Sequence, residues 1–298
     1  MKKVTMFFFV LLLFVSIFGF SPNLYFNLKA GAWFQTNSDQ DPFITTLYGN
    51  SNMGITFIRD DVTAQFELGR DGGTRIMRAT IPFLNGELTV GKTYIPGASG
   101  GSAQGADPSF SFDSPFPGVI FMNREHQVSY STKSGLTATI LGPISAPDVT
   151  TGTPKVVLAW ELPVFDGVIF TPVFGYGQAW GDSTHVACLG GVSFKSANVQ
   201  GQFFIAGNPA DLGLVTIPDV DDVGGGWIQL RQGKLSLGGG YCQEMSSGDG
   251  LSAGTVFLNY KLASNNVSFI PEVGYFYGDG FVSENTAYAG LKMVVAIE

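Results

Sequence analysis

Residues on which catalysis, metal binding and disulfide scaffolds depend are scarce in this chain. Its 298 residues include 2 cysteines and 2 histidines. A small disulfide-stapled domain carries more cysteines than this. With so few histidines, no dense set of histidine, aspartate and glutamate points to a metal or protease site. Charged residues make up only 13% of the chain, about half the usual share of a soluble domain.

Basic residues are in particularly short supply. There are 16 Lys and Arg against 24 Asp and Glu, and Lys2 and Lys3 belong to the extreme N-terminus. Without those two, 14 basic residues face 24 acidic ones, a formal charge of −10. Binding to a phosphate backbone needs the opposite sign. We therefore expect no nucleic-acid partner.

Long apolar runs are absent after Phe20. The one such run, Val4 to Phe18, follows Lys2 and Lys3 and precedes a small residue, Gly19. This pattern is typical of a secretory signal peptide, so we expect residues 1–19 to be removed on export. The alternative is an uncleaved membrane anchor. Against it, the run is short for a membrane span and the next basic residue is Lys29.

Helical periodicity is missing too, and strict alternation takes its place. Near the N-terminus, Leu24, Phe26 and Leu28 share one face of an extended chain, with Asn27 and Lys29 on the other. The same alternation recurs in VTAQFEL (62–68), KVVLAWEL (155–162), TVFLNYKL (255–262) and AYAGLKMVVAI (287–297). The sequence therefore predicts an all-β protein.

About sixteen strands can be placed between the bends of the chain. They are expected at residues 23–34, 50–58, 62–69, 74–83, 87–94, 124–131, 136–142, 155–163, 168–180, 185–195, 198–207, 225–231, 235–244, 254–262, 267–277 and 286–297. Short turns alternate with longer, polar, glycine-rich connections such as 36–46, 142–154, 208–224 and 245–253. We expect this alternation to be strict.

Even strand number, about ten residues per strand and two classes of connection are the signature of a transmembrane β-barrel. Closure leaves no open edge and satisfies the backbone inside hydrocarbon. Residues 20–298 are therefore predicted to form one antiparallel barrel. Aromatic residues near strand ends fit girdles at the two membrane interfaces; examples are Phe34, Tyr94, Tyr176, Trp180, Tyr275 and Tyr277. A soluble sandwich, the alternative, gives no reason to sort connections by length.

The longest connection, 95–122, has no strand or helix period. Loops of this length in a compact fold are usually functional. With the N-terminus on the inner side, it is the third external connection. Its run of small residues, GASGGSA (97–103), lets the backbone pack closely against a wall, and Asp107 and Asp113 supply negative charge. We expect it to fold into the barrel and narrow it.

The stretch leading into this connection resembles the corresponding hairpin of bacterial outer-membrane porins. The hairpin of that family has a basic residue, an alternating apolar stretch, a turn and an L-x-x-G-[RK] ending. In this chain the basic residue is Arg78, the alternating stretch is 79–84 and the turn is Asn85-Gly86. The ending is formed by Leu88, Gly91 and Lys92. The resemblance implies a homotrimeric channel in the outer membrane, in contact with its lipid. It implies passive diffusion of small hydrophilic solutes and ions, without a cofactor. It also implies a basic wall, here Arg78 and Arg124, facing Asp107 and Asp113.

If the apolar set of each strand faces lipid, the alternate set lines the lumen. An Arg or Lys on the lipid face near mid-bilayer costs about 2–4 kcal/mol, which favours this phase. The charged residues predicted to face inward are Lys29, Glu67, Arg78, Glu125, Glu161, Arg231, Lys261, Glu272 and Lys292, with Arg124 at a loop junction. The alternative for each is a merely solvated position near a rim. From the acidic balance we expect a weak to moderate cation preference.

Two other functions remain open. An enzyme is disfavoured because His126 and Ser129, three residues apart in a strand, point to opposite faces. A surface adhesin or structural barrel with a plugged lumen is the stronger alternative. Cys188 and Cys242 are expected on the tenth and thirteenth strands, too far apart for a disulfide.

Overall fold

The computed structural model describes residues 21–36, 43–47, 51–69, 72–95, 121–122, 124–141, 155–178, 184–208, 214–215, 221–246, 250–278 and 286–297. The predicted signal peptide, Asp107 and Asp113 lie outside these ranges. No helix long and apolar enough to cross a membrane occurs within them.

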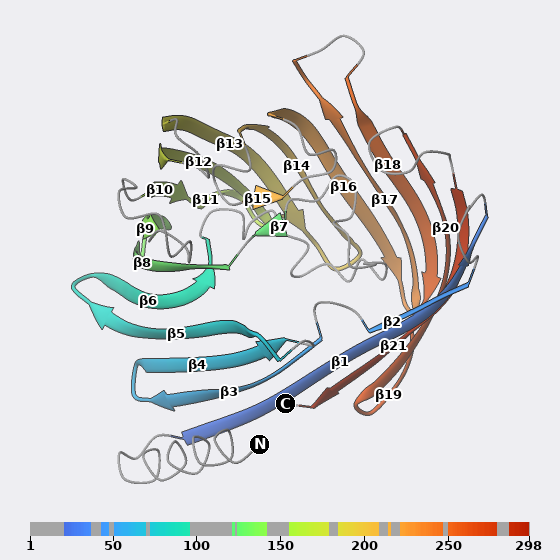
Figure 1. Cartoon of the computed structure of the whole chain (residues 1–298), viewed down its shortest axis with the longest axis horizontal. Helices are drawn as coiled ribbons and strands as arrows, with labels where there is room; N and C mark the ends of the chain where they lie inside the picture. Colours follow the sequence, from blue (N-terminus) through green and yellow to red (C-terminus); the bar gives the residue numbers. More distant parts are fainter. Residues whose placement is uncertain are drawn as a thin grey trace.

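Antiparallel strands follow one another around a closed barrel (Figure 1). In the first half of the chain they are β1 (Ser21–Gln35), β2 (Phe43–Leu47), β3 (Asn52–Arg59), β4 (Val62–Gly69), β5 (Thr74–Phe83), β6 (Gly86–Tyr94), β8 (Arg124–Thr132) and β9 (Leu136–Leu141). In the second half they are β10 (Lys155–Trp160), β11 (Leu162–Phe165), β12 (Val168–Gln178), β13 (Thr184–Lys195), β14 (Val199–Gly207), β16 (Asp222–Gln232), β17 (Leu235–Glu244), β18 (Ser252–Tyr260), β19 (Leu262–Ser264), β20 (Val267–Tyr277) and β21 (Thr286–Ile297).

These 19 segments amount to sixteen barrel strands, because three strands are each divided in two. β2 and β3 both bond to β1, β10 and β11 both bond to β12, and β18 and β19 both bond to β20. The last strand, β21, pairs with the first along Phe26–Gln35 and closes the ring. The predicted fold class and strand number are confirmed.

Side chains alternate between the two faces of this wall as predicted. On β10, Val156, Leu158 and Trp160 are 39%, 42% and 43% exposed, whereas Val157 and Ala159 between them are 1% and 3% exposed. The exposed set points outward, since a closed sheet buries one face only. On β8 the rule separates His126, which is exposed, from Ser129, which is buried, so these two residues lie on opposite faces as expected.

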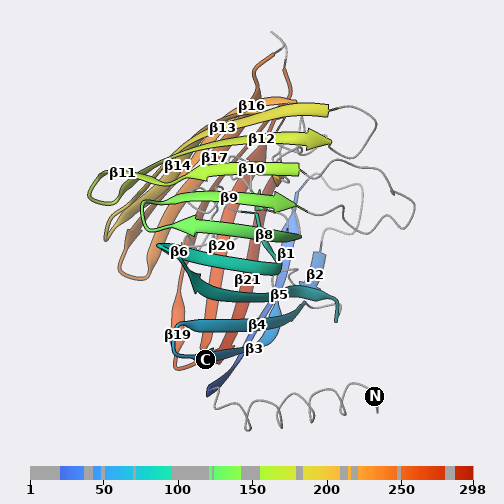
Figure 2. The same cartoon turned by 90° about the vertical axis from the view of Figure 1, so that its left-hand side faces the viewer.

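Tight hairpin turns gather at one end of the barrel, for example between β8 and β9 (Figure 2). Asp60 and Asn265 occupy two of them with φ of 52° and 49°, the left-handed region that these residue types tolerate best outside glycine. One connection at the opposite end breaks the expected alternation of lengths. Only residues 70–73 join β4 to β5, so the prediction of strict alternation was wrong there.

The main buried apolar cluster lies on the inner face, over β9 to β17. It is formed by Ile95, Leu141, Val157, Ala159, Val173, Ala187, Leu189, Phe204, Ala206, Val223 and Cys242. Both cysteines are free thiols, Cys188 exposed and Cys242 buried. They lie on β13 and β17, the tenth and thirteenth barrel strands, as predicted.

A separate ladder of two short strands lies outside the barrel ladder. It consists of β7 (Phe121–Met122), which precedes β8, and β15 (Leu214–Val215), which lies in the connection between β14 and β16. In the view of Figure 1 both are drawn within the ring of barrel strands.

Candidate functional site

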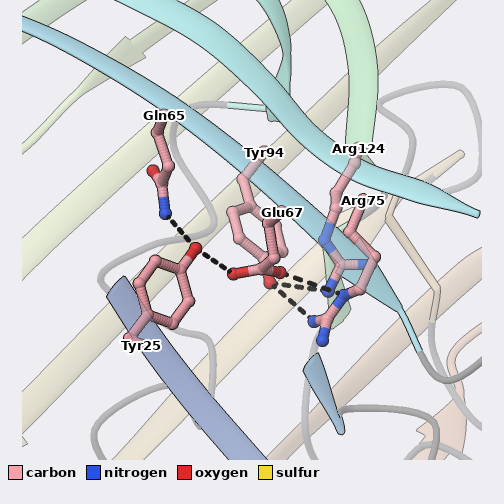
Figure 3. Close-up of polar contacts among 6 residues, drawn as sticks. All are labelled: Tyr25, Gln65, Glu67, Arg75, Tyr94 and Arg124. Carbon is pink, nitrogen blue, oxygen red and sulfur yellow. Dashed lines mark hydrogen bonds and ion pairs between the residues drawn. The ribbon is translucent and has the colours of Figure 1, made fainter. Parts of the chain in front are cut away.

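Charged and aromatic side chains from five strands meet on the inner face of β1, β4, β5, β6 and β8 (Figure 3). At its centre, Arg75 Nε lies 3.2 Å from Glu67 Oε1, and the two side chains are 10% and 7% exposed. A pair this buried is poorly screened by solvent. Removing one member of a buried pair typically costs about 3–5 kcal/mol, because the other charge is left uncompensated.

A β-bulge brings Arg75 into this group. The register between β4 and β5 shifts between Glu67, which opposes Ile76, and Leu68, which opposes Thr74. Arg75 is the extra residue, and a bulged residue can turn its side chain away from the face that alternation assigns. Strict alternation from Arg78 places Arg75 on the outer face. Alternation along the sequence therefore does not predict Arg75 in this group, and no local pattern in the sequence marks the bulge.

Tyr25 and Gln65 complete the acidic side of the group. The Tyr25 hydroxyl donates to Glu67 Oε2 (2.8 Å), and Gln65 Nε2 donates to the Tyr25 oxygen (2.8 Å). The tyrosine ring reaches Glu67 by crossing Gly54 on the strand between them. A Cβ at Gly54 would lie 2.4 Å from the Tyr25 hydroxyl oxygen and 2.6 Å from the Phe66 carbonyl oxygen. The absence of a side chain at position 54 therefore makes room for this network.

Tyr94 joins two arginines on the basic side. Its hydroxyl oxygen accepts from Arg124 Nη2 at 2.6 Å and from Arg75 Nη2 at 3.4 Å, and the Arg124 guanidinium lies 4.4 Å from the ring centroid. The Tyr94 hydroxyl oxygen is therefore hydrogen-bonded to two arginine side chains on the inner face. The prediction that Tyr94 belongs to an aromatic girdle was wrong.

Arg78 lies beside this group on β5. Its Nη1 donates to Thr93 Oγ1 at 3.4 Å, and the residue opposite it in register is Gly91. Gly91 has φ of +125°, and a Cβ there would lie 2.1 Å from the Met77 carbonyl oxygen and 2.9 Å from the Arg78 Cα. The backbone conformation and the lack of space for a Cβ therefore both require glycine at position 91, in the hairpin that resembles that of the porins.

The group carries three guanidinium groups for one carboxylate. Within the described part of the chain, Nε of Arg78, Nε of Arg124, and Nε and Nη1 of Arg75 are buried without a hydrogen-bond partner. The ion pair of Arg75 with Glu67 is therefore close in distance but out of line for a hydrogen bond. This section of the inner wall is locally cationic in an otherwise acidic chain.

Comparison with known proteins finds the same architecture. No family model matches the chain, and no curated protein matches it. Among solved structures, OmpF of Salmonella typhi in complex with daunomycin superposes with a TM-score of 0.64 at 14% identity, over 93% of this chain and 98% of that one. A triple mutant of the Rhodopseudomonas blastica porin gives a TM-score of 0.59 at 13% identity, covering 93% of this chain and 100% of the other.

A third structure is the trimer form of in-vitro folded OmpT, an outer membrane protein of Vibrio cholerae. It gives a TM-score of 0.59 at 15% identity, over 93% of this chain and 99% of that chain. The chain has the porin fold. At such low identity the likeness extends to the fold and does not transfer the role of any residue.

A second polar network lies on the inner face of the porin fold beside the closing seam. The Tyr288 hydroxyl donates to Glu272 Oε1 at 3.0 Å, and Asn259 Nδ2 donates to Glu272 Oε2 at 3.3 Å. Glu272 and Lys292 are each 5% exposed, and Lys29 follows on the neighbouring strand β1. These three charged residues share the inner face, as the alternation predicts.

The remaining predicted residues are divided between two places. Glu125 is buried on the inner face of β8, opposite Thr93. Glu161, Arg231 and Lys261 lie instead at the short-turn end, where their backbone amides bond to the Gly135, Asn198 and Lys234 carbonyls of adjacent turns. They belong to a rim, away from Arg75, Arg78 and Arg124, which together form the arginine group. Among the described residues no set of three or more metal-ligating side chains occurs.

Proposed function

We propose that this protein is an outer-membrane porin through which small hydrophilic solutes and ions diffuse passively. The observation that carries the proposal is the closed ring of sixteen strands, with large apolar side chains exposed on its outer face and charged networks on its inner face. An exposed apolar band of this extent belongs in hydrocarbon rather than in water. A closed barrel also leaves no unpaired edge in the membrane.

The size of the ring supports a channel. Sixteen strands spaced about 4.8 Å apart and tilted by about 40° close into a barrel about 32 Å across. Side chains alone do not fill a ring of this diameter, whereas they do fill one of about eight strands. Transport by diffusion uses no cofactor and no catalytic residue. We also propose a homotrimer, supported by the trimer form of the Vibrio cholerae structure.

A plugged barrel with an adhesive or structural role is the second candidate. It is favoured by the inner apolar cluster, in which Val157, Leu189 and Phe204 are 1%, 4% and 3% exposed on a face that would otherwise meet water. Reconstitution into a planar lipid bilayer separates the two functions. A porin gives stable, ohmic single-channel steps, whereas a plugged barrel gives none under the same folding conditions.

Ion selectivity tests the place of the arginine group in the conduction path. One unit charge about 6 Å from a permeating ion contributes about 0.7 kcal/mol in water. Arg78→Glu changes the wall by two charges, so we expect the reversal potential in a salt gradient to move toward cations, with up to about a tenfold change in relative permeability at low ionic strength.

Arg231→Glu makes the same change of charge at the exposed short-turn rim, where we expect a smaller shift because the field is less focused there. Equal shifts in reversal potential for Arg78→Glu and Arg231→Glu would contradict the proposal that the arginine group lies in the narrow part of the conduction path. The acidic balance of the chain still predicts a weak to moderate cation preference for the unmodified channel, measurable in the same salt gradient.

A further inference from the structure

The arginine group is short of negative charge and of hydrogen-bond acceptors. Among the described residues, its three guanidinium groups share one ion-paired carboxylate, that of Glu67, so two positive charges are left over. In the same part of the chain, Nη1 of Arg75, Nε of Arg78 and Nε of Arg124 are buried without a hydrogen-bond partner. Buried polar atoms of native proteins nearly always have a partner. The composition of the group is therefore that of an anion site.

Glu67 is held on one side of the group by its own partners. Its Oε2 accepts from the Tyr25 hydroxyl at 2.8 Å, and Gln65 Nε2 donates to the same hydroxyl oxygen at 2.8 Å (Figure 3). Its Oε1 lies 3.2 Å from Arg75 Nε. The carboxylate that belongs to the wall is therefore fixed beside Arg75, and Arg78 and Arg124 are left for another anion.

A second acidic residue on this face is placed near other cations. Glu125 follows Arg124 on β8 and lies opposite Thr93. The charges that act on its carboxylate are those of Lys92 and Lys155. Glu125 therefore does not cancel the excess charge of the arginine group.

Tyr94 adds a neutral donor between two of the guanidinium groups. Its hydroxyl oxygen accepts from Arg124 Nη2 at 2.6 Å and from Arg75 Nη2 at 3.4 Å, so these two nitrogens are no more than about 6 Å apart. A hydroxyl that accepts twice still has its own proton to donate. The Tyr94 carbonyl accepts from Gln127 Nε2 at 2.7 Å, which holds the tyrosine backbone in place. Two cations and one O–H donor therefore converge within the span of a small ligand.

The donor set selects the class of anion. Each guanidinium presents its N–H groups as a planar fork that matches the paired oxygens of a carboxylate or a phosphate, whereas a halide offers a single atom. Arg75, Arg78, Tyr94 and Arg124 are each partly exposed on the inner face, so a solute in the lumen can reach them. Charges in such partly buried positions are weakly screened by salt. Two surplus positive charges then favour a ligand with two negative charges.

We propose that the arginine group, with the Tyr94 hydroxyl, is a binding site for a small divalent oxyanion, either phosphate or a dicarboxylate. This inference rests on the proposed function as a channel, because the ligand arrives through the lumen. The oxyanion accepts hydrogen bonds from Arg78, Arg124 and Tyr94, and it competes with Glu67 for Arg75. The channel thus holds one class of anion although the chain as a whole is acidic.

Titration calorimetry on the refolded protein tests binding without requiring conduction. At constant low ionic strength, we expect phosphate, in its divalent form, or succinate to bind at least about tenfold more tightly than acetate, because the second negative charge meets the same two surplus charges at about 6 Å. Arg124→Gln should weaken binding of the divalent anion about tenfold. Arg231→Gln, the same substitution at the exposed short-turn rim, is the matched control and should leave the affinity within about twofold.

Glu67→Gln separates a binding role from a structural one. It removes the competing carboxylate, so the affinity for the divalent anion should rise about tenfold, whereas damage to the wall would lower it. Tyr94→Phe keeps the ring under Arg124 and removes the O–H donor, so the affinity should fall about tenfold. Equal affinities for succinate, phosphate and acetate, or equal losses in Arg124→Gln and Arg231→Gln, overturn the site.

Current recordings distinguish failure of the site from failure of the channel. In a planar bilayer, the better-bound divalent anion should reduce the potassium chloride current of the unmodified protein with the dissociation constant found by calorimetry, and Arg124→Gln should need about tenfold more of it. If the protein conducts but calorimetry detects no preference for divalent anions, the site is refuted and the porin function stands. If calorimetry detects the preference and the protein never conducts, the proposed channel function fails and the site stands.

Discussion

An arginine at position 90 tests whether the outer face of the barrel meets hydrocarbon. Val90 lies in the middle of β6, points outward and is 46% exposed. An arginine on the lipid face near the bilayer midplane destabilises a transmembrane barrel by about 2–4 kcal/mol. We therefore expect Val90→Arg to lower the folding equilibrium constant about 30- to 700-fold, at about 1.4 kcal/mol per factor of ten.

The adjacent residue provides a control at the same depth. Thr89 points inward and is half-buried, and its hydroxyl pairs with that of Thr80 at 3.0 Å. Thr89→Arg places the same charge on the inner face, where it can be solvated, and loses one hydrogen bond worth about 1 kcal/mol. We expect Val90→Arg to cost clearly more than Thr89→Arg.

The measurement is reversible guanidinium unfolding in phospholipid vesicles, followed by tryptophan fluorescence. Repeating it with vesicles of thinner hydrocarbon brings position 90 closer to an interface and should reduce the cost of Val90→Arg alone, since the penalty depends on depth. Equal costs for the two variants in every lipid would refute the assignment of the faces, and with it the argument that β6 spans a bilayer.

Two further predictions concern the group around Glu67. Glu67→Gln should lower the free energy of unfolding by about 3–5 kcal/mol because it removes the carboxylate paired with Arg75. Tyr25→Phe should lower it by about 1.5–3 kcal/mol because the hydrogen bond that is lost is to a charged group. A double-mutant cycle of these two substitutions in vesicles should give a coupling energy above about 0.5 kcal/mol, and strict additivity would contradict the contact between Tyr25 and Glu67. Gly91→Ala should destabilise the barrel by about 1–3 kcal/mol or more, because φ of +125° and the Met77 carbonyl oxygen both oppose a Cβ. Gly190→Ala, whose added Cβ meets open space, should not destabilise it. Equal thermal midpoints of the two variants in lipid would count against the geometry at position 91.

Much of the wall could be predicted because its determinants are local. Alternation in segments such as 62–68 and 255–262 is a property of a few consecutive residues, and burial of one face then sets the direction of every side chain in the strand. The same alternation placed Glu67, Glu272 and Lys292 on the inner face. Cys188 and Cys242 could be placed on separate strands by counting turns.

The arginine group could be predicted only in part. Arg78 and Arg124 were expected to form a basic wall, but Arg75 enters the group through a register shift against β4. Tyr94 was expected at a membrane interface because it ends a strand, whereas its hydroxyl accepts hydrogen bonds from two arginines on other strands. The first case is decided by the pairing register of two adjacent strands and the second by an arginine 30 residues away, and an alternation pattern records neither.

The inner apolar cluster shows a different limit. In KVVLAWEL the outward residues Val156 and Leu158 and the inward residues Val157 and Ala159 are all apolar. Only Lys155 and Glu161 mark the inward face of this segment as polar, and the apolar Val157 and Ala159 between them do not show whether that part of the inner wall is buried.

By itself, then, the sequence determined the strands, their phase and the number of reversals, because side chains of an extended chain alternate with a period of two whatever lies beside them. The tertiary structure decided which segments meet: β1 with β21 at the seam, Arg75 with Glu67 across a bulge, and Leu214 with Met122 between two connections. The seam is the closure of the ring itself, whereas the ion pair depends on a register shift between two adjacent strands. Closure sets the register and brings together residues that no local pattern relates.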